Sequence, residues 1–213
     1  MGYKGKHVLV TSGPAAVALD DVRVITNRST GEMGRLIADA LHREGARVTL
    51  LEGSAATSRL PLPEAIALKR FYFYDELDQG LVRELRKGYD VVIHAAAVPD
   101  FRPARACRGK MASGQALTLK LIPTKKLIGK IKQLSPRSLL VGFKLATRKF
   151  SGAFPLNVKD LFDKAGCDLV VANAYVDGNY QACLFGPQGR VSPEGLAKKA
   201  LVKVLINAIG LQS

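Results

Sequence analysis

The feature that most limits the possible fold is a series of short apolar runs in which apolar and polar residues do not alternate. A strand with this pattern is buried on both faces, as in a parallel sheet. Segments with helical periodicity separate the runs, and this alternation is typical of α/β proteins. We therefore predict a Rossmann-like, doubly wound, mostly parallel sheet with helices on both faces. The runs are HVLVTSG (7–13), ARVTLLEG (46–53), DVVIHAAAV (90–98), SLLVGF (138–143) and CDLVVANAY (167–175).

Other segments complete this prediction. RFYFY (70–74) reads as a short aromatic strand, and YQACLFG (180–186) as an edge strand. ALTLKLI (116–122) alternates, so it predicts a half-exposed strand in a small β extension outside the main sheet. The pattern leaves open whether this extension is used in dimerisation or forms a lid over the site. A closing helix should begin with Ser192 as N-cap and Pro193 at the first helical position. Further helices are expected over 33–46, 75–88, 125–134 and 155–166.

Length and composition indicate one intracellular domain. The 213 residues fit a single domain, 1–213, without repeats or a long linker. No apolar run has transmembrane length, and residues 1–6 lack the apolar core of a signal peptide, so we expect a cytoplasmic protein without a membrane partner. The three cysteines are widely spaced, which predicts no metal site.

The net charge of +14 requires a reason. A solvated basic face is one explanation, and phosphate-rich ligands are the sharper one. A nucleic-acid partner is not expected, because the chain has no basic tail and no known nucleic-acid motif.

The stretch 20–34 carries the pattern N-x-S-x-G-x-x-G after the first strand. Ser29 or Thr30 could cap the following helix, and its glycines would allow a ligand or a neighbouring strand to come close to the backbone. A helix N-terminus binds anions, and Arg23 could grip a phosphate. A capped helix with glycines for tight packing explains the pattern equally well.

Four strand ends carry polar or small residues. A plain turn would also accept each of them taken singly, so the prediction depends on all four lying together. In a doubly wound sheet these ends lie at one edge, where ligands bind. We therefore predict a ligand site along that edge. The four ends are Ser12-Gly13, Ala95 to Asp100, Gly142 to Lys144, and Ala172-Asn173.

Taken together, the motifs resemble those of phosphopantothenate–cysteine ligases, in the form without a fused decarboxylase domain. The resemblance spans Val8 to about Ala174, with the strings VLVTSG, LDDVRVITNRSTGEMG, HAAAVPDF, LTLKLI, VGFKLAT and DLVVANA in the family's order. It implies a homodimer that joins 4'-phosphopantothenate to L-cysteine in coenzyme A biosynthesis. ATP or CTP would activate the carboxylate as an acyl-nucleotidylate with loss of pyrophosphate, and Mg²⁺ would bind mainly through the nucleotide phosphates.

The resemblance also implies residue roles. Asn27 would hold the substrate carboxylate and the acyl intermediate, and Lys110 would be the catalytic lysine that neutralises developing phosphate charge. Arg23 would reach the substrate phosphate bound in the partner subunit. Ala97 and Asp100 would contact the pantothenate arm. The nucleotide would meet Gly13, Ser29, Gly31, Gly34, Ala96, Asp100, Lys126, Phe143 and Asn173.

Some positions depart from the family pattern. Ala15-Ala16-Val17, Glu32 and Ala174 replace residues that relatives use, which leaves nucleotide choice and full activity open. One alternative is a degenerate, non-catalytic nucleotide or nucleic-acid binder. Another is an NAD(P)-dependent oxidoreductase with Glu52 as the ribose-binding acid, although TSGPAAV lacks the G-x-G-x-x-G pattern. His94 is interpreted as a satisfied strand-end residue rather than an acid or base.

Overall fold

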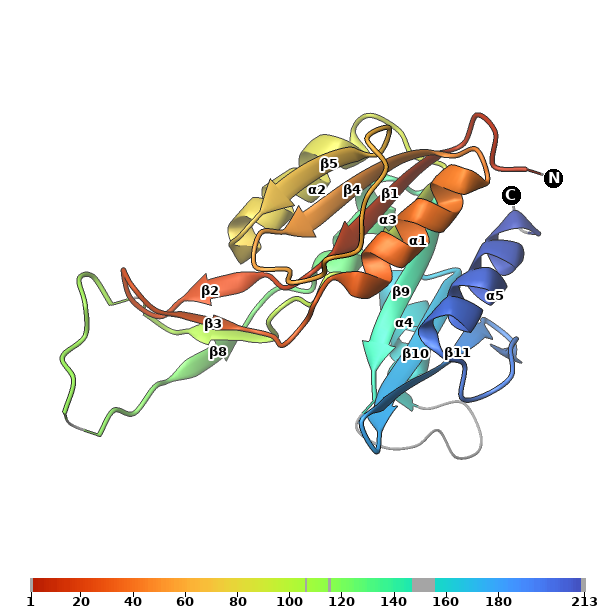
Figure 1. The fold of residues 1–213 in the computed structure, drawn as a ribbon. Helices are drawn as coiled ribbons and strands as arrows, with labels where there is room; N and C mark the ends of the chain where they lie inside the picture. Colours follow the sequence, from red (N-terminus) through yellow and green to blue (C-terminus); the bar gives the residue numbers. More distant parts are fainter. Residues whose placement is uncertain (1, 106, 115, 147–155, 212–213) are drawn as a thin grey trace.

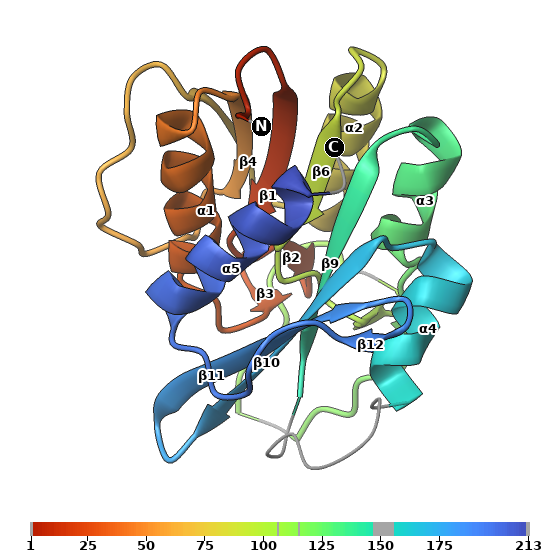
Figure 2. The ribbon, with the colours of Figure 1, turned by 90° about the vertical axis from the view of Figure 1, so that its right-hand side faces the viewer.

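An eight-stranded sheet forms the centre of the computed structural model, which describes residues 2–105, 107–114, 116–146 and 156–211. Its strand order is β12-β11-β10-β9-β6-β1-β4-β5 (Figures 1 and 2). The six neighbouring strands β10, β9, β6, β1, β4 and β5 are parallel. Strands β11 and β12 add antiparallel pairs at one edge. The predicted mostly parallel sheet is confirmed. The strands are β1 (His7–Ser12), β4 (Arg47–Gly53), β5 (Ala67–Phe71), β6 (Val91–His94), β9 (Leu139–Leu145), β10 (Leu169–Val176), β11 (Asn179–Gly186) and β12 (Gly189–Arg190).

Helices cover both faces of the sheet (Figures 1 and 2). Each face has its own apolar core, and successive residues of β1 point to opposite cores, with Val8 and Val10 in one and Leu9 in the other. The first core lies under α1 (Glu32–Arg43) and α5 (Lys198–Gly210). The second lies under α2 (Tyr74–Leu85), α3 (Leu127–Leu134) and α4 (Leu156–Ala165).

A small arm projects beyond the carboxyl ends of the parallel strands (Figure 1). Strands β2 (Ala16–Ala18) and β3 (Val24–Thr26) form one two-stranded sheet, and β7 (Phe101–Pro103) and β8 (Leu121–Pro123) form another. The expected extension outside the main sheet therefore exists, but only the last residues of the predicted strand 116–122 are paired.

The predicted start of α1 is confirmed to within one residue, whereas that of α5 is wrong. Helix α1 begins at Glu32 with Gly31, φ 76°, as its N-cap residue, and of the two expected caps Thr30 accepts a 3.3 Å hydrogen bond from the Glu32 N–H. Helix α5 begins at Lys198 rather than near Pro193, because the Leu196 and Ala182 backbones exchange hydrogen bonds of 2.8 and 3.0 Å that keep the chain extended. The Ser192 hydroxyl instead accepts from the Leu184 N–H at 2.8 Å.

Two strand assignments also change. The strand predicted at 70–74 lies at Ala67–Phe71, and Tyr74 opens α2 with its hydroxyl donating to the Lys125 carbonyl oxygen at 2.7 Å. Strand β11 is not the edge, because the two-residue strand β12 pairs with it. Thr147 of the VGFKLAT motif and Pro155 at the start of a predicted helix lie outside the described residues. Among the described helices, none is both long and apolar enough to cross a membrane.

Candidate functional site

The candidate site lies where the parallel strands end and the arm begins. Gly13 follows β1, Ala96 and Ala97 follow β6, and α1 begins beside them after the β2–β3 excursion. Phe143 and Asn173 lie inside the adjacent strands β9 and β10, which continue past the predicted ends to Leu145 and Val176. The strand ends predicted after β1 and β6 are confirmed and the other two are wrong in their bounds, although all four segments lie toward the carboxyl ends of neighbouring strands.

The glycines of the first turn are needed for packing. A Cβ at Gly34 would lie 2.3 Å from the Ser12 Cβ and Oγ atoms, and one at Gly31 would lie 2.9 Å from the Ala56 Cβ. Gly13 and Gly31 both have positive φ, 74° and 76°. The packing explanation of the pattern is thus directly supported. It is compatible with a ligand, since the first-turn N–H groups of Met33 and Gly34 receive no side-chain cap.

The loops after β1 and β6 are joined into one unit. The Ala97 N–H donates to the Gly13 carbonyl oxygen at 2.9 Å, and the Ala15 N–H donates to the Ala97 carbonyl oxygen at 3.0 Å. The Ala96 N–H donates to the Thr11 Oγ1 at 3.1 Å. The N–H groups of Ala96 and Ala97 therefore donate to acceptors within the protein. A ligand would contact the other backbone atoms and the methyl groups of these residues.

His94 supports this unit from within. Its Nδ1 lies 2.9 Å from the Thr11 Oγ1, which already accepts the Ala96 N–H. The direction of this hydrogen bond depends on the ring tautomer, because the Thr11 hydroxyl can donate or accept a further bond. Burial lowers the pKa of His94 to about 4, so the ring is neutral at pH 7. These contacts agree with the interpretation of His94 as a satisfied strand-end residue.

Asp100 and Lys126 are brought together by the start of α3. The Lys126 Nζ forms an ion pair with the Asp100 carboxylate, and both side chains are largely exposed. The Thr124 hydroxyl and N–H hold this turn by donating to the carbonyl oxygens of Pro99 at 2.6 Å and Asp100 at 2.9 Å. Both predicted nucleotide residues therefore sit on a fixed turn, where an incoming phosphate would compete with Asp100 for the ammonium group.

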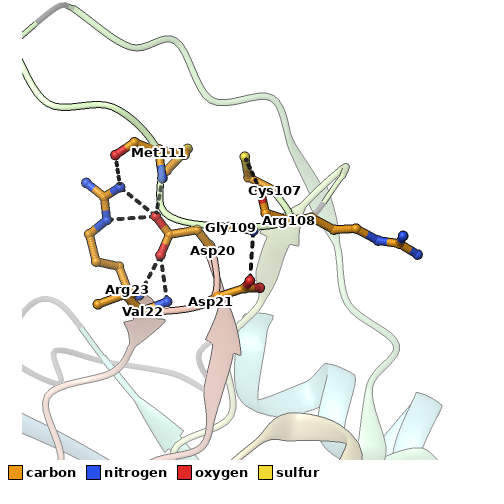
Figure 3. A network of polar contacts seen from close by, with 8 residues as sticks. All are labelled: Asp20, Asp21, Val22, Arg23, Cys107, Arg108, Gly109 and Met111. Carbon is orange, nitrogen blue, oxygen red and sulfur yellow. Dashed lines mark hydrogen bonds and ion pairs between the residues drawn. The ribbon is translucent and has the colours of Figure 1, made fainter.

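Arg23 and the Lys110 segment meet on the arm (Figure 3). The Arg23 guanidinium donates to the Asp20 carboxylate, with Nε 2.9 Å from Oδ2, and to the Met111 carbonyl oxygen at 2.9 Å. These bonds, with further donation from backbone N–H groups, hold the pKa of the Asp20 carboxyl well below its usual range. Asp20 is not among the predicted site residues. The sequence does carry a sign of its role, because an aspartate whose carboxylate accepts from the N–H groups two and three residues later forms an Asx turn.

The remaining predicted residues show fewer contacts. Asn27 is exposed directly after β3, and Ser29 is half-buried. Phe143 is half-buried and packs against the core under α1 and α5. Asn173 is half-buried in β10, in register with Leu145 of β9. Contacts among the described residues therefore join part of the predicted set in three groups, the glycine turn with the β6 loop, the Asp100–Lys126 pair, and the arm, and leave Asn27, Phe143 and Asn173 outside them.

Glu52 has a structural environment that the sequence did not reveal. It is fully buried, and Arg35 donates to its two oxygens at 2.8 and 2.7 Å. Arg70 adds a third bond of 2.7 Å. With both oxygens engaged by arginines, Glu52 is unsuited to accept the ribose hydroxyls of a nicotinamide cofactor, which argues against the oxidoreductase alternative.

A basic surface hollow of about 560 Å³ lies elsewhere, between β5 and α2. At its floor Lys69, Lys87 and Tyr89 donate to Glu84. Burial alone would raise the pKa of the Glu84 carboxyl, but these hydrogen bonds hold it below the ordinary value. The hollow contains no predicted site residue and is lined by Leu51, Lys69, Arg70, Gly80, Arg83, Glu84, Arg86 and Lys87.

Comparison with known families matches residues 3–207 to the family model described as DNA/pantothenate metabolism flavoprotein C-terminal domain. The coenzyme A biosynthesis bifunctional protein CoaBC of Thermococcus kodakarensis is 39% identical over 171 residues, which cover 80% of this chain and 41% of that protein. The CoaBC protein of Vibrio cholerae is 30% identical over 213 residues, covering 96% of this chain and 52% of that protein. The chain thus spans about two fifths to a half of these relatives.

Solved structures show the same fold. The DNA/pantothenate metabolism flavoprotein from Streptococcus pneumoniae superposes with a TM-score of 0.82 at 23% identity, covering 98% of this chain and all of the other. A Cab2 mutant in complex with phosphopantothenate-cysteine gives a TM-score of 0.78 at 20% identity, covering 97% of this chain and 86% of the other. The family resemblance expected from the motifs is confirmed, and this chain belongs to the DNA/pantothenate metabolism flavoprotein C-terminal domain family.

Proposed function

We propose that this chain is a ligase that joins 4'-phosphopantothenate and L-cysteine, with ATP or CTP as the activating nucleotide. The observation that carries the proposal is the first turn of α1, where the Met33 and Gly34 N–H groups receive no side-chain cap, beside the hydrogen-bonded β1–β6 loop unit. Such a helix start offers N–H groups and a positive dipole end to phosphates. The family of the chain supports the choice of reaction, as does the phosphopantothenate-cysteine held by the Cab2 mutant of the same fold.

In the proposed reaction the substrate carboxylate attacks the nucleotide α-phosphorus, and the bond to the bridging oxygen of pyrophosphate breaks. The amine of cysteine then attacks the acyl carbon, loses a proton, and expels the nucleoside monophosphate. The attacking carboxylate is already ionised at neutral pH, so the first step requires no general base. The protein contributes mainly charge stabilisation and orientation.

The proposed roles are those that the family resemblance implies. Asn27 holds the substrate carboxylate through its amide, and Lys110 neutralises charge that develops on the departing phosphates. Gly13, Ser29, Gly31, Gly34 and the Asp100–Lys126 turn surround the nucleotide. Mg²⁺ would be held chiefly by the nucleotide phosphates, as is common for this hard ion.

One departure from the family pattern is compensated in the structure. Glu32 occupies a position where relatives carry a lysine, and a carboxylate at the first turn of α1 would repel phosphates. The Lys198 ammonium of α5 forms an ion pair with Glu32. The local charge is thereby neutralised, and this favours a catalytically competent site over the degenerate binder.

A homodimer is part of the proposal. The arm exposes apolar side chains that water does not favour, and a second copy would cover them. In that assembly Arg23 would reach the phosphate of a substrate bound in the partner. The exposed side chains are Val22, Phe101, Leu117, Leu119 and Leu121.

Pyrophosphate release tests the function. The protein is incubated with 4'-phosphopantothenate, Mg²⁺ and either CTP or ATP, with and without cysteine. Release that requires phosphopantothenate supports acyl-nucleotidylate formation and identifies the nucleotide. Absence of release from folded protein with both nucleotides would overturn the ligase assignment and favour a non-catalytic binder. Lys110→Gln should slow release about 100-fold, whereas Lys120→Gln on the same arm should retain the wild-type rate.

A further inference from the structure

Lys110 lies between two residues whose backbones are held in place. Its own side chain is exposed, and no ion pair to it is found in the part of the chain that the structure describes. Its neighbours Gly109 and Met111 are both bound to the turn that connects β2 and β3 (Figure 3). The backbone is therefore fixed on either side of an ammonium group that remains free.

Asp20 holds the Met111 side. Asp20 is 4% exposed, and its two carboxylate oxygens accept hydrogen bonds from different groups. Oδ1 accepts from the N–H groups of Val22 at 2.9 Å and Arg23 at 2.7 Å, which shapes the turn. Oδ2 accepts from the Met111 N–H at 3.0 Å, and the Arg23 guanidinium bridges Oδ2 and the Met111 carbonyl oxygen. Both polar backbone groups of Met111 are thereby tied to the turn.

Asp21 holds the Gly109 side. Its Oδ2 accepts from the Gly109 N–H at 2.7 Å, and its own N–H donates to the Gly109 carbonyl oxygen at 3.4 Å. Gly109 has φ 76°, a left-handed conformation that glycine adopts without strain. The glycine lets the segment turn back onto Asp21, so both polar backbone groups of Gly109 are also tied to the turn.

We propose that Asp20 and Asp21 are positioning residues for Lys110, which fix the backbone on both sides of it and present its ammonium group to the substrates. This inference rests on the proposed ligase function. A lysine on a loose loop would have to be ordered in each catalytic cycle, whereas a fixed one is already oriented when charge develops. Neither aspartate touches the reacting atoms, and each acts through the Lys110 backbone.

Asp20→Asn tests the Met111 side. If the amide oxygen of the introduced asparagine accepts the two N–H groups of the turn, its NH₂ group faces the Met111 N–H and the Arg23 guanidinium, so donor meets donor. The turn is kept and the anchor is lost. Pyrophosphate formation at saturating substrates should slow by about 10- to 100-fold. Asp39→Asn removes the same charge from a partly exposed ion pair on α1 and should leave the rate unchanged.

Asp21 provides a second test that does not disturb a buried carboxylate, since Asp21 is exposed. Asp21→Ala removes the acceptor for the Gly109 N–H and should also slow pyrophosphate formation. Asp21→Asn keeps a side-chain oxygen for that N–H and should lose much less. An Asn variant as slow as the Ala variant would contradict an anchoring role.

The double variant separates positioning from general damage. In a Lys110→Gln background, Asp20→Asn should cause no further loss of rate, because the ammonium group that it positions is gone. Full additivity of the two losses would overturn the proposal.

Trypsin cleavage tests the anchoring without measuring enzyme activity, because Arg108 and Lys110 are cleavage sites within the anchored segment. Cleavage there should accelerate several-fold in Asp20→Asn and Asp21→Ala but not in Asp39→Asn.

The outcomes distinguish the two proposals. If the wild-type protein releases no pyrophosphate, the ligase function fails, and the positioning role fails with it. If the wild-type protein is active but Asp20→Asn and Asp21→Ala keep its rate, the ligase function stands and the positioning role alone is wrong. Unchanged trypsin cleavage in these variants would show that the aspartates do not anchor the segment and would likewise overturn the positioning role.

Discussion

Gly34 of α1 approaches Ser12 of β1 so closely that a Cβ on Gly34 would lie 2.3 Å from both the Cβ and the Oγ of Ser12. The Ser12 hydroxyl cannot move aside freely, because it donates a 2.8 Å hydrogen bond to the Gly31 carbonyl oxygen. The first strand and the first helix are thus in contact at the point where the proposed phosphates bind. A single methyl group would separate them.

We therefore expect Gly34→Ala to lower the free energy of unfolding by about 2 kcal/mol, the usual cost of overpacking. Urea denaturation measures this loss. In a Ser12→Gly background the same substitution should cost clearly less, since the clashing Cβ is absent. Gly129→Ala in α3 is the matched control: the nearest atom to its Cβ would be the Lys164 carbonyl oxygen at 3.9 Å, so stability should be unchanged or increased. Equal losses at the two glycines would contradict the contact.

Arg35→Met should destabilise the protein by about 3 kcal/mol, because it leaves the buried Glu52 carboxylate with Arg70 as its remaining arginine partner. Arg43→Met removes an exposed ion pair with Asp39 on the same helix and should cost no more than about 0.5 kcal/mol. Thermal unfolding of the two variants compares a buried ion pair with an exposed one. A similar change in Tm for both would show that Glu52 does not depend on Arg35.

His94 should make the protein less stable in weak acid. The unfolded chain takes up a proton near the ordinary pKa of 6.5, whereas the buried ring does so near 4. Between these values the unfolded state binds more protons, so stability falls as the pH drops. From pH 7 to pH 5 this single group should remove about 2 kcal/mol. A His94→Gln variant should lose that much less over the same range in urea denaturation, and parallel pH dependences would contradict the burial of a neutral ring.

Asn27→Asp should reduce turnover more than about tenfold, since about 1.4 kcal/mol of repulsion between the new carboxylate and that of the substrate suffices. Steady-state pyrophosphate release measures the change. Asn207→Asp makes the same substitution at an exposed position of α5 and should be silent. Wild-type turnover in Asn27→Asp would remove Asn27 from the site.

Arg23→Ala should raise the KM for phosphopantothenate if this guanidinium binds the substrate phosphate. Because Arg23 also bridges Asp20 and the Met111 carbonyl oxygen, a fall in kcat should accompany the change. Separate titrations of phosphopantothenate and nucleotide distinguish the effects. A rise in the nucleotide KM alone would show that Arg23 does not bind the phosphate of phosphopantothenate.

The main sheet was predictable because burial on both faces leaves a clear pattern in the sequence. Runs such as 90–98 have few alternatives to a parallel strand, although strand β6 itself ends at His94 and the alanines after it form a loop. Strands β2, β3 and β7 have three residues each, which is too short for any periodicity to show. The start of α5 was mispredicted because the hydrogen bonds between Ala182 and Leu196 override the helix-start signal at Ser192-Pro193.

The site was predictable where it depends on local sequence. The glycine turn and the small residues after β6 were found because they follow strands directly. The contacts that organise the site were not, since Asp20 and Met111 lie 91 residues apart and Arg35 and Glu52 lie 17 apart. Such partners are chosen by the fold, and no spacing rule in the sequence identifies them.

Strand β1 is the first strand of the sheet in chain order, yet it lies inside the sheet between β4 and β6. During synthesis at about 5–20 residues per second, roughly 4 to 16 s pass between completion of β1 and of β6. For that time the inward-lying strand β1, buried from Val8 to Ser12 in the native sheet, has an unpaired edge, a condition that promotes association with other chains. We therefore expect the yield of native protein to depend on translation speed over the segment between Ser12 and His94.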